Sequence, residues 1–176
     1  MIPSNRIRLL LSSALLLLFT GCTTLQPLLF WQGFDFEAQT LSVDELRRAL
    51  ICETPTEASR LQVFDSAEAL RASAVAQLLQ VDQLAQLTED ASYIVVEQGQ
   101  RRTGGFSLEV RDDASVDEEG QLLLMADWIE PQPDRLQIQI LTSLCVLLEL
   151  PPMPYTSVTL QDGGGATRAA WQRQPD

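Results

Sequence analysis

Residues 93–110 read Tyr93-Ile-Val-Val-Glu-Gln-Gly-Gln-Arg-Arg-Thr-Gly-Gly-Phe-Ser-Leu-Glu-Val110, and they carry the clearest strand pattern in the chain. The run 93–96 is apolar at every position, which is typical of a central strand. The run 106–110 alternates apolar and polar side chains, as a strand does when one face is buried. Gly104 and Gly105 precede the second run and give the backbone the freedom that a tight turn needs. The stretch therefore predicts a β-hairpin.

Similar strand patterns continue on both sides of this stretch. They occupy residues 34–41, 61–64, 121–128, 136–140, 145–150 and 155–160. Turn residues separate the later runs at intervals of about ten residues, which is typical of an antiparallel sheet or a small sandwich. We expect a single β-rich domain over 34–162, followed by a polar tail over 163–176.

A helical pattern lies between the early strands. Apolar residues repeat at helical spacing from Ala67 to Val81, with Asp65 and Glu68 at the spacing of a capping box, and they predict one helix over about 66–80. Residues 42–50 fit either a short helix or an extension of the preceding strand. The fold class that we expect is α+β and mostly β, with one or two helices covering the antiparallel sheet or small sandwich.

The charged residues exclude most familiar enzyme classes. The 176-residue chain has 12 basic residues, all of them arginine, against 24 acidic ones, so its formal net charge is −12. Without lysine or histidine it cannot form Ser-His-Asp or Cys-His arrangements, Schiff bases or a His-ligated metal site. The acidic balance argues against nucleic acid as a partner. No carboxylate pair stands out by its spacing, so we expect no enzyme activity and no cofactor, and a carboxylate-based hydrolase is the least favoured alternative.

The amino terminus has the pattern of a bacterial lipoprotein signal. Arg6 and Arg8 precede an apolar run over 9–19 that is too short to span a bilayer and is typical of a secretory signal. Phe19-Thr-Gly-Cys22 then resembles a lipobox, in which the cysteine is acylated after the signal is removed. We expect residues 1–21 to be a signal peptide, Cys22 to carry the lipid, for example palmitate, and 22–33 to form a stem.

The same signal predicts the location of the domain. Acyl chains on Cys22 tether a protein to a membrane without crossing it. Thr23 follows the cysteine, and by resemblance to sorted lipoproteins this residue favours the outer membrane over the inner one. We therefore expect a lipid-anchored outer-membrane protein whose domain faces the periplasm, with the cell surface as the alternative.

Lipidation of Cys22 leaves an even number of cysteines. The chain has Cys22, Cys52 and Cys145, and lipidation of the first leaves two. In an oxidising envelope compartment two such cysteines form a disulfide most simply. The alternative is two buried reduced thiols that pack as small apolar side chains.

The acidic segment 112–119 departs from the spacing of an EF-hand calcium loop. Counting from Asp113 as the first position, the sixth position is Glu118 instead of glycine and the twelfth is Leu124 instead of glutamate. The segment therefore fails as an EF-hand. We expect a solvated acidic loop and no metal site, with weak divalent binding as the alternative.

Residues 92–160 resemble the carboxy-terminal domain of the protease complex subunit PrcB family. The hallmark of that family is a strand, a Gly-x-(Arg/Lys)-Pro-Thr-Gly-Gly-Tyr turn and an alternating strand. This chain has Gly99-Gln-Arg-Arg-Thr-Gly-Gly-Phe106, with Arg102 in place of the proline. The members are mostly small envelope lipoproteins, and the founding member is an accessory subunit of a surface protease complex without peptidase activity. The resemblance implies a binding or chaperone-like role.

The turn is the candidate contact site for an envelope protein, which the family resemblance suggests could be a protease. On an acidic domain, two adjacent arginines at an exposed hairpin tip are suited to carboxylate or carbonyl partners. The predicted contact residues are Arg101, Arg102, Thr103, Gly104, Gly105 and Phe106. The alternative is a purely structural turn. A weaker likeness, of Thr103-Gly-Gly-Phe106 to the Thr-Thr-Gly-Tyr loop of chagasin-type cysteine-peptidase inhibitors, suggests instead that the turn blocks an active-site cleft.

Overall fold

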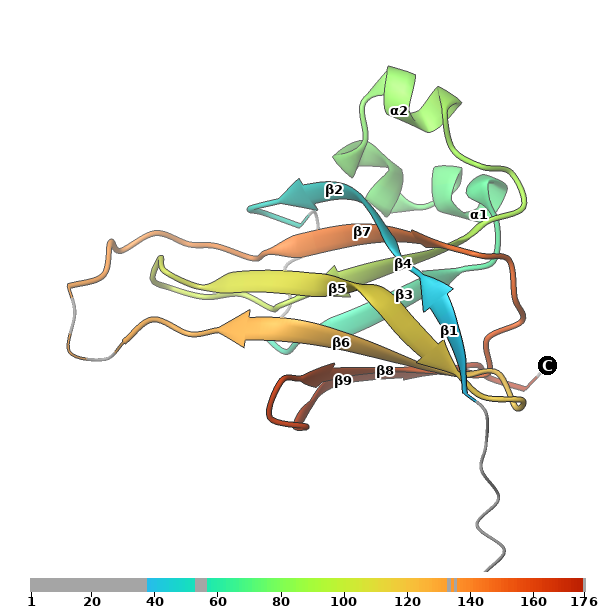
Figure 1. Cartoon of the computed structure of the whole chain (residues 1–176). Helices are drawn as coiled ribbons and strands as arrows, with labels where there is room; N and C mark the ends of the chain where they lie inside the picture. The colour runs from blue at the N-terminus through green and yellow to red at the C-terminus, as the bar shows by residue number, and fades with distance from the viewer. Residues whose placement is uncertain (1–37, 53–56, 133, 135, 176) are drawn as a thin grey trace, which may run out of the picture. The chain divides into compact units, whose positions relative to one another are not determined.

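Figure 1 shows a computed structural model of the chain, which describes residues 38–52, 57–132, 134 and 136–175. Within these residues the chain forms two β-sheets and three short helices. The strands are β1 (Gln39–Ser42), β2 (Asp44–Ala49), β3 (Arg60–Phe64), β4 (Ser92–Glu97), β5 (Ser107–Val116), β6 (Gln121–Ile129), β7 (Cys145–Leu150), β8 (Ser157–Asp162) and β9 (Thr167–Gln172). The helices are α1 (Ala67–Arg71), the 3₁₀ helix η1 (Ala74–Leu78) and α2 (Val81–Ala85).

The two sheets form a sandwich. One sheet has the strand order β1-β5-β6-β8-β9, and the other has the order β2-β7-β4-β3. All neighbouring strands are antiparallel except β6 and β8, which are parallel. Helices α1 and α2 lie over the outer face of the four-stranded sheet (Figure 1). The predicted fold class, mostly β with covering helices, is confirmed.

Strand β4 explains why the run 93–96 is apolar at every position. Ile94 and Val96 face the core between the two sheets, whereas Tyr93 and Val95 face the helices. All four side chains are buried. A strand that is covered on both faces needs apolar residues at consecutive positions, because neither face meets water.

Residues 42–50 form neither the short helix nor a simple extension of the preceding strand. Residues 44–49 form β2, a separate strand that follows β1 almost without interruption but belongs to the other sheet. At the crossing point the buried Val43 donates its backbone N–H to the carbonyl of Asp112 at 2.9 Å. The chain therefore joins the two sheets along this side of the sandwich.

The single helix expected over 66–80 was wrong. Helix α1 begins after Ser66, whose hydroxyl accepts the N–H of Ala69 at 3.2 Å, so Ser66 and not Asp65 is the N-cap. The helix ends because the hydroxyl and the N–H of Ser73 both bond to the carbonyl of Leu70. Serine competes with helix continuation in this way. The apolar residues at helical spacing are divided among three short helices, α1, η1 and α2.

Two further predictions at the end of the chain also fail. Residues 136–140 form no strand, and the expected polar tail contains β9. The stretch Asp162-Gly-Gly-Gly165 is a hairpin turn between β8 and β9, not the end of the domain. Bonds to the carboxylate of Asp162, chiefly from the backbone N–H of Ala166, lower its pKa and hold this turn. Trp171 packs against the core from β9.

The connection from β7 to β8 is held by a buried tyrosine. The hydroxyl of Tyr155 donates to the carbonyl of Pro151 at 2.9 Å, which ties the ends of the proline-rich segment together. Burial raises the pKa of Tyr155 to about 12, so the hydroxyl keeps the proton that this bond requires.

The acidic segment 112–119 lies mostly in strand β5 rather than in a loop. Asp112 and Asp113 belong to the exposed part of β5, and the turn is confined to the residues between Val116 and Gln121. In the part of the chain that the structure describes, no group of three His, Cys, Asp or Glu side chains is arranged to hold a metal ion. No helix among the same residues is long and apolar enough to cross a membrane.

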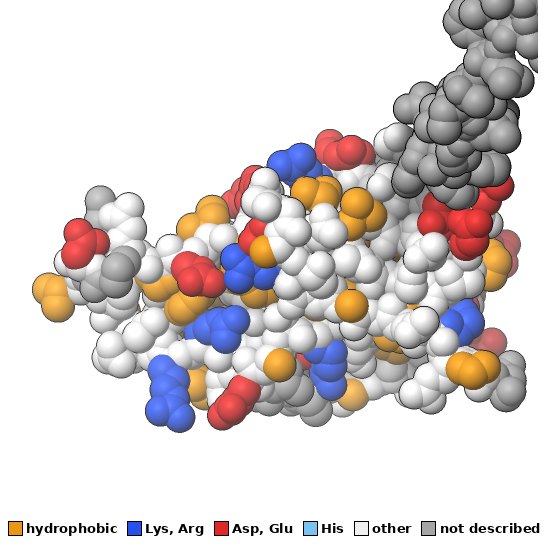
Figure 2. All heavy atoms as spheres, turned by 90° about the horizontal axis from the view of Figure 1, so that it is seen from below, with side chains coloured by type: hydrophobic (Ala, Val, Ile, Leu, Met, Phe, Trp, Pro, Cys, Tyr) orange, Lys and Arg blue, Asp and Glu red, His pale blue; other side chains and the backbone are white. Residues whose placement is uncertain are grey.

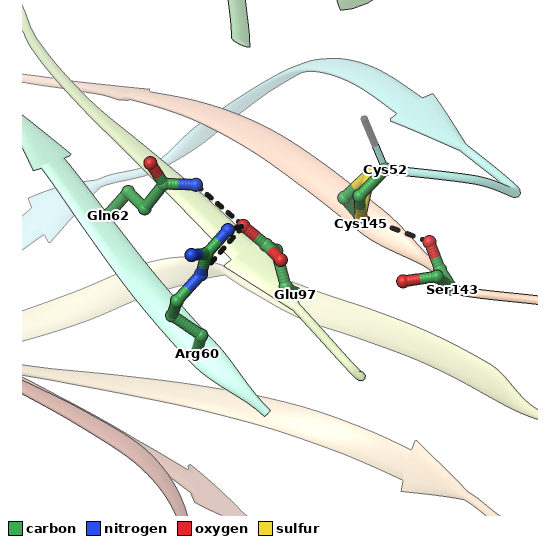
Figure 3. Close-up of a disulfide and its surroundings, with 6 residues drawn as sticks. All are labelled: Cys52, Arg60, Gln62, Glu97, Ser143 and Cys145. Atoms are coloured by element: carbon green, nitrogen blue, oxygen red, sulfur yellow. Dashed lines mark hydrogen bonds and ion pairs between the residues drawn. A yellow bond between two sulfur atoms is a disulfide. The ribbon is translucent and has the colours of Figure 1, made fainter. Parts of the chain in front are cut away.

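A disulfide joins Cys52 to Cys145, as the cysteine count predicted, with 5.8 Å between the two Cα atoms (Figure 3). It fixes the chain after β2 to the first residue of β7. Beside it, Glu97 of β4 is the register partner of Cys145. The Glu97 side chain is 2% exposed, and its Oε1 accepts hydrogen bonds from Arg60 and Gln62 of β3. Cys52, Gln62 and Glu97 line one cavity of about 30 Å³.

Candidate protein-binding surface

The stretch 98–106 is a crossover between the two sheets, not the predicted hairpin. Strand β4 already has β3 and β7 as neighbours, and β5 has β1 and β6, so neither strand has an edge left for the other. Gly99 starts the crossover with φ +83°, and a Cβ at this position would lie 2.7 Å from the carbonyl oxygen of Glu57. Only glycine fits both the backbone angle and this close approach.

The crossover runs alongside the chain that precedes β7. Gln98 donates its N–H to Leu144 at 2.8 Å, and Arg101 exchanges two backbone hydrogen bonds with Thr142 at 2.7 and 2.9 Å. Further on, Gly104 donates its N–H to the carbonyl of Ile138 at 2.9 Å. Residues 98–106 and 136–144 therefore support each other and form one end of the sandwich.

The two arginines of the predicted contact site differ in their surroundings. Arg101 is half-buried, where its guanidinium donates to the carbonyl of Gln98 at 3.0 Å and lies 5.4 Å from the ring centre of Phe106. Arg102 is exposed and makes no hydrogen bond or ion pair with the described residues. The prediction of two exposed donors was therefore wrong for Arg101, which holds the crossover in place, while Arg102 is free to contact a partner.

The other predicted contact residues are only partly accessible. Thr103, Gly104 and Phe106 are half-buried, and Phe106 packs against the core. Gly105 is exposed with φ +88°, and a Cβ there would meet Gln137 at 2.6 Å. The crossover is thus held against the domain by hydrogen bonds and packing, and Arg102 is exposed at its surface.

Large apolar side chains are exposed at the same end of the molecule. Leu136, Ile138, Ile140 and Leu141 are 105%, 78%, 51% and 55% exposed. The chain at Leu50 and Ile51, also exposed, joins them, because its backbone bonds to Ser143. Figure 2 shows apolar and arginine side chains side by side toward this end. We call the exposed set of Leu50, Ile51, Arg102, Gly105 and residues 136–141 the end surface.

The sequence contains a partial signal for this surface. The alternation of Leu136, Ile138 and Ile140 predicts a half-buried strand, whereas in the structure these side chains are exposed. Leu50 and Ile51 carried no signal, because nothing in the local pattern shows that β2 ends in a turn there. A contiguous set of exposed aliphatic side chains of this size is typical of a protein interaction site.

Several buried polar atoms behind the end surface have no hydrogen-bond partner among the described residues. They are Gln98 Oε1, Arg101 Nε, Thr142 Oγ1 and Ser143 Oγ. Each such atom costs about 1–3 kcal/mol when it is left unpaired. Departures of this kind from well-satisfied packing concentrate at functional sites.

The end surface lies far from the point where the described chain begins. Gln39 of β1 pairs with Val116 at one end of β5, whereas the crossover enters β5 at Ser107, its other end. The ten residues of β5 span about 30 Å at roughly 3.3 Å per residue. The end surface and the first described residues therefore lie at opposite ends of β5.

Residues 92–151 match the sequence model of the family described as PrcB C-terminal. The match runs from the start of β4 to the residue after β7, and so it includes the crossover and the 136–144 segment. It confirms the resemblance found in the sequence, over a slightly shorter span. No curated protein and no solved structure is significantly similar to the chain.

Proposed function

We propose that this chain is a non-enzymatic lipoprotein of the outer membrane whose sandwich binds and stabilises another envelope protein, as an accessory subunit of a protease complex. One observation carries the proposal. The family match falls on the part of the fold that builds the end surface, where aliphatic side chains and one free arginine are exposed together. Aliphatic contacts supply affinity to a protein partner, and an exposed guanidinium supplies a directed hydrogen bond.

The position of the end surface fits a tethered protein. The lipid would be attached at Cys22, 16 residues before the first described residue, Ala38. That segment leads to the Val116 end of β5.

The inhibitor alternative has less support. A chagasin-like loop needs a free tip that can enter a cleft. Here Gly104 is bonded to Ile138, and both Thr103 and Phe106 are half-buried. The crossover and the 136–144 segment would have to contact a partner together, as a surface rather than as a wedge.

Replacement of Cys22 tests the anchor. In cells labelled with radioactive palmitate, the wild-type protein is expected to carry label and to fractionate with the outer membrane. Cys22→Ser should lose the label and the membrane association, because acyl chains anchor a protein strongly whereas so acidic a domain is not attracted to anionic lipid. Cys52→Ser is the matched control and should keep the label. Palmitate on the Cys22→Ser variant would contradict the proposal.

Replacement of Arg102 tests the contact site. Arg102→Ala is expected to weaken partner binding about tenfold, which corresponds to the loss of one interface anchor of about 1.4 kcal/mol. The thermal midpoint should not change, because Arg102 makes no hydrogen bond or ion pair with the residues that the structure describes. The measurement is the amount of envelope protein that is crosslinked and co-purified from intact cells at equal abundance of each variant.

Arg111→Ala is the matched control for this experiment. Arg111 is an exposed arginine of β5 whose guanidinium lies 3.9 Å from Asp127. Its loss should leave the co-purified protein unchanged. If Arg102→Ala and Arg111→Ala give the same result, the crossover is structural and the proposal loses its contact site.

A further inference from the structure

The chain that precedes β7 has the sequence of a strand, and one of its edges is already paired. Figure 1 shows this segment continuing in the line of β7 beyond the sheet. Ile138 accepts a hydrogen bond from Gly104, and Thr142 exchanges two with Arg101. In an extended chain the N–H and C=O of one residue point to the same side, and successive residues alternate. The even-numbered residues from 136 to 142 therefore face the crossover.

No described residue pairs with the opposite edge over most of its length. Ser143 bonds to Leu50 and Cys52 on that side, at 2.9 and 3.0 Å. Toward the amino terminus from Ser143, the next residues whose backbone groups face this side are Leu141, Gln139 and Gln137. None of these three makes a backbone hydrogen bond to any residue that the structure describes. An exposed edge of this kind is a template for pairing with a strand from another chain.

We propose that the strand that pairs with this edge is residues 136–140 of a second copy of the chain, antiparallel and centred on Ile138. The sequence Leu136-Gln-Ile-Gln-Ile140 has the same pattern in both directions. With Ile138 opposite the partner's Ile138, Leu136 lies opposite the partner's Ile140. Gln137 then lies opposite the partner's Gln139. Every apolar side chain meets an apolar one, and every amide meets an amide.

The backbone requires the same register. In an antiparallel pair the residues alternate between hydrogen-bonded and non-bonded positions. Centring on Ile138 makes it a non-bonded position, and Gln137 and Gln139 become the bonded ones. These are the residues whose N–H and C=O groups face outward in the single chain. The symmetry of the sequence and the free backbone groups therefore select one arrangement.

Charge and symmetry favour a second copy over an unrelated strand. The chain has a net charge of −12, yet residues 136–144 carry no charge, so this edge is a place where two acidic domains can meet without like charges facing each other. The contact uses the same patch on both copies, and such a two-fold contact closes after two molecules. The pairing is argued from the sequence and backbone of residues 136–141 and uses no property of Arg102 or Leu50, so the inference stands or falls independently of the proposed function even though both involve the end surface.

A proline substitution separates this pairing from side-chain packing. Gln139→Pro removes an N–H for which the described residues provide no acceptor, whereas Gln139→Ala keeps it. Sedimentation velocity on the full chain in mild detergent should show a dimer for the wild type and for Gln139→Ala. Gln139→Pro should raise the dimer dissociation constant tenfold or more, since the two-fold contact loses two backbone hydrogen bonds of about 1 kcal/mol each. Its thermal midpoint should stay that of the wild type at concentrations where both are monomeric.

Cysteine crosslinking gives a second, independent readout. Cα atoms in a non-bonded antiparallel pair are about 4.5 Å apart, which is within disulfide range. Ile138→Cys should therefore form a disulfide-linked dimer in oxidised cells, and Val81→Cys, an equally exposed position on α2, should not. A wild type that stays monomeric, a dimer that Gln139→Pro leaves intact, or crosslinking of Cys at 138 only to another protein would overturn the proposal.

Discussion

Loss of the Cys52–Cys145 disulfide is expected to lower the free energy of unfolding by about 4–5 kcal/mol. The two cysteines are 93 residues apart in the sequence, so the bond restricts a large loop of the unfolded chain. The bond also holds the chain after β2 against β7, and the end surface is built on both. We expect the double variant Cys52→Ala/Cys145→Ala to show this loss in urea unfolding of the full chain in mild detergent.

Reduction of the wild-type protein provides the control. Dithiothreitol should bring the wild type close to the stability of the double variant and should not change the double variant itself. Cys22→Ala should unfold like the wild type, because Cys22 lies outside the crosslinked loop. A loss of less than about 1 kcal/mol in the double variant would mean that the two thiols are not joined in the folded protein.

Loss of Arg60 is expected to lower the free energy of unfolding by about 3 kcal/mol, because it leaves a buried carboxylate without its charged partner. The Glu97 side chain is 2% exposed, and Arg60 donates to it at 2.6 and 3.1 Å. After Arg60→Met, Gln62 is the one described residue that still donates to this carboxylate. The measurement is the urea midpoint and slope of the variant compared with the wild type.

A second substitution distinguishes the unpaired charge from lost packing. In Arg60→Met/Glu97→Gln no carboxylate is buried, and the amide oxygen at position 97 still accepts the hydrogen bond from Gln62. We expect this double variant to recover most of the loss, since replacing both members of a buried pair is often nearly neutral. A double variant that is as unstable as Arg60→Met would show that packing of the Arg60 side chain, and not its charge, matters.

The sequence alone predicted three features correctly, because each one depends on residues that can be recognised without knowing the fold. Strand β4 was predicted because a strand with both faces covered needs apolar residues at every position. The disulfide was predicted because lipidation of Cys22 leaves two cysteines in an oxidising compartment. The family was identified from the residues that follow Gly99, and the match of its sequence model to residues 92–151 confirms it.

Pairing between distant strands was not predictable from local patterns. The stretch 98–106 has the glycines of a hairpin, but both edges of β4 and of β5 are taken by strands from elsewhere in the chain. Residues 163–176 looked like a tail because the glycines of a turn and the polar face of an edge strand have the same composition. Trp171 was the one signal that this segment packs on the core.

The segment 136–140 shows a different limit. Its alternating pattern predicts a half-buried strand, yet residues 136–140 form no strand and Leu136, Ile138 and Ile140 are exposed. Alternation alone does not show whether the described chain supplies a surface that covers the apolar side chains.

Site-specific photo-crosslinking in intact cells tests most directly whether the end surface binds an envelope protein. A photoreactive amino acid at position 102 reports on the end surface, and one at position 119 reports on the exposed turn at the other end of β5. We predict that position 102 crosslinks to one envelope protein other than this chain and that position 119 does not. The same products from both positions, or a partner crosslinked from position 119 alone, would contradict the account.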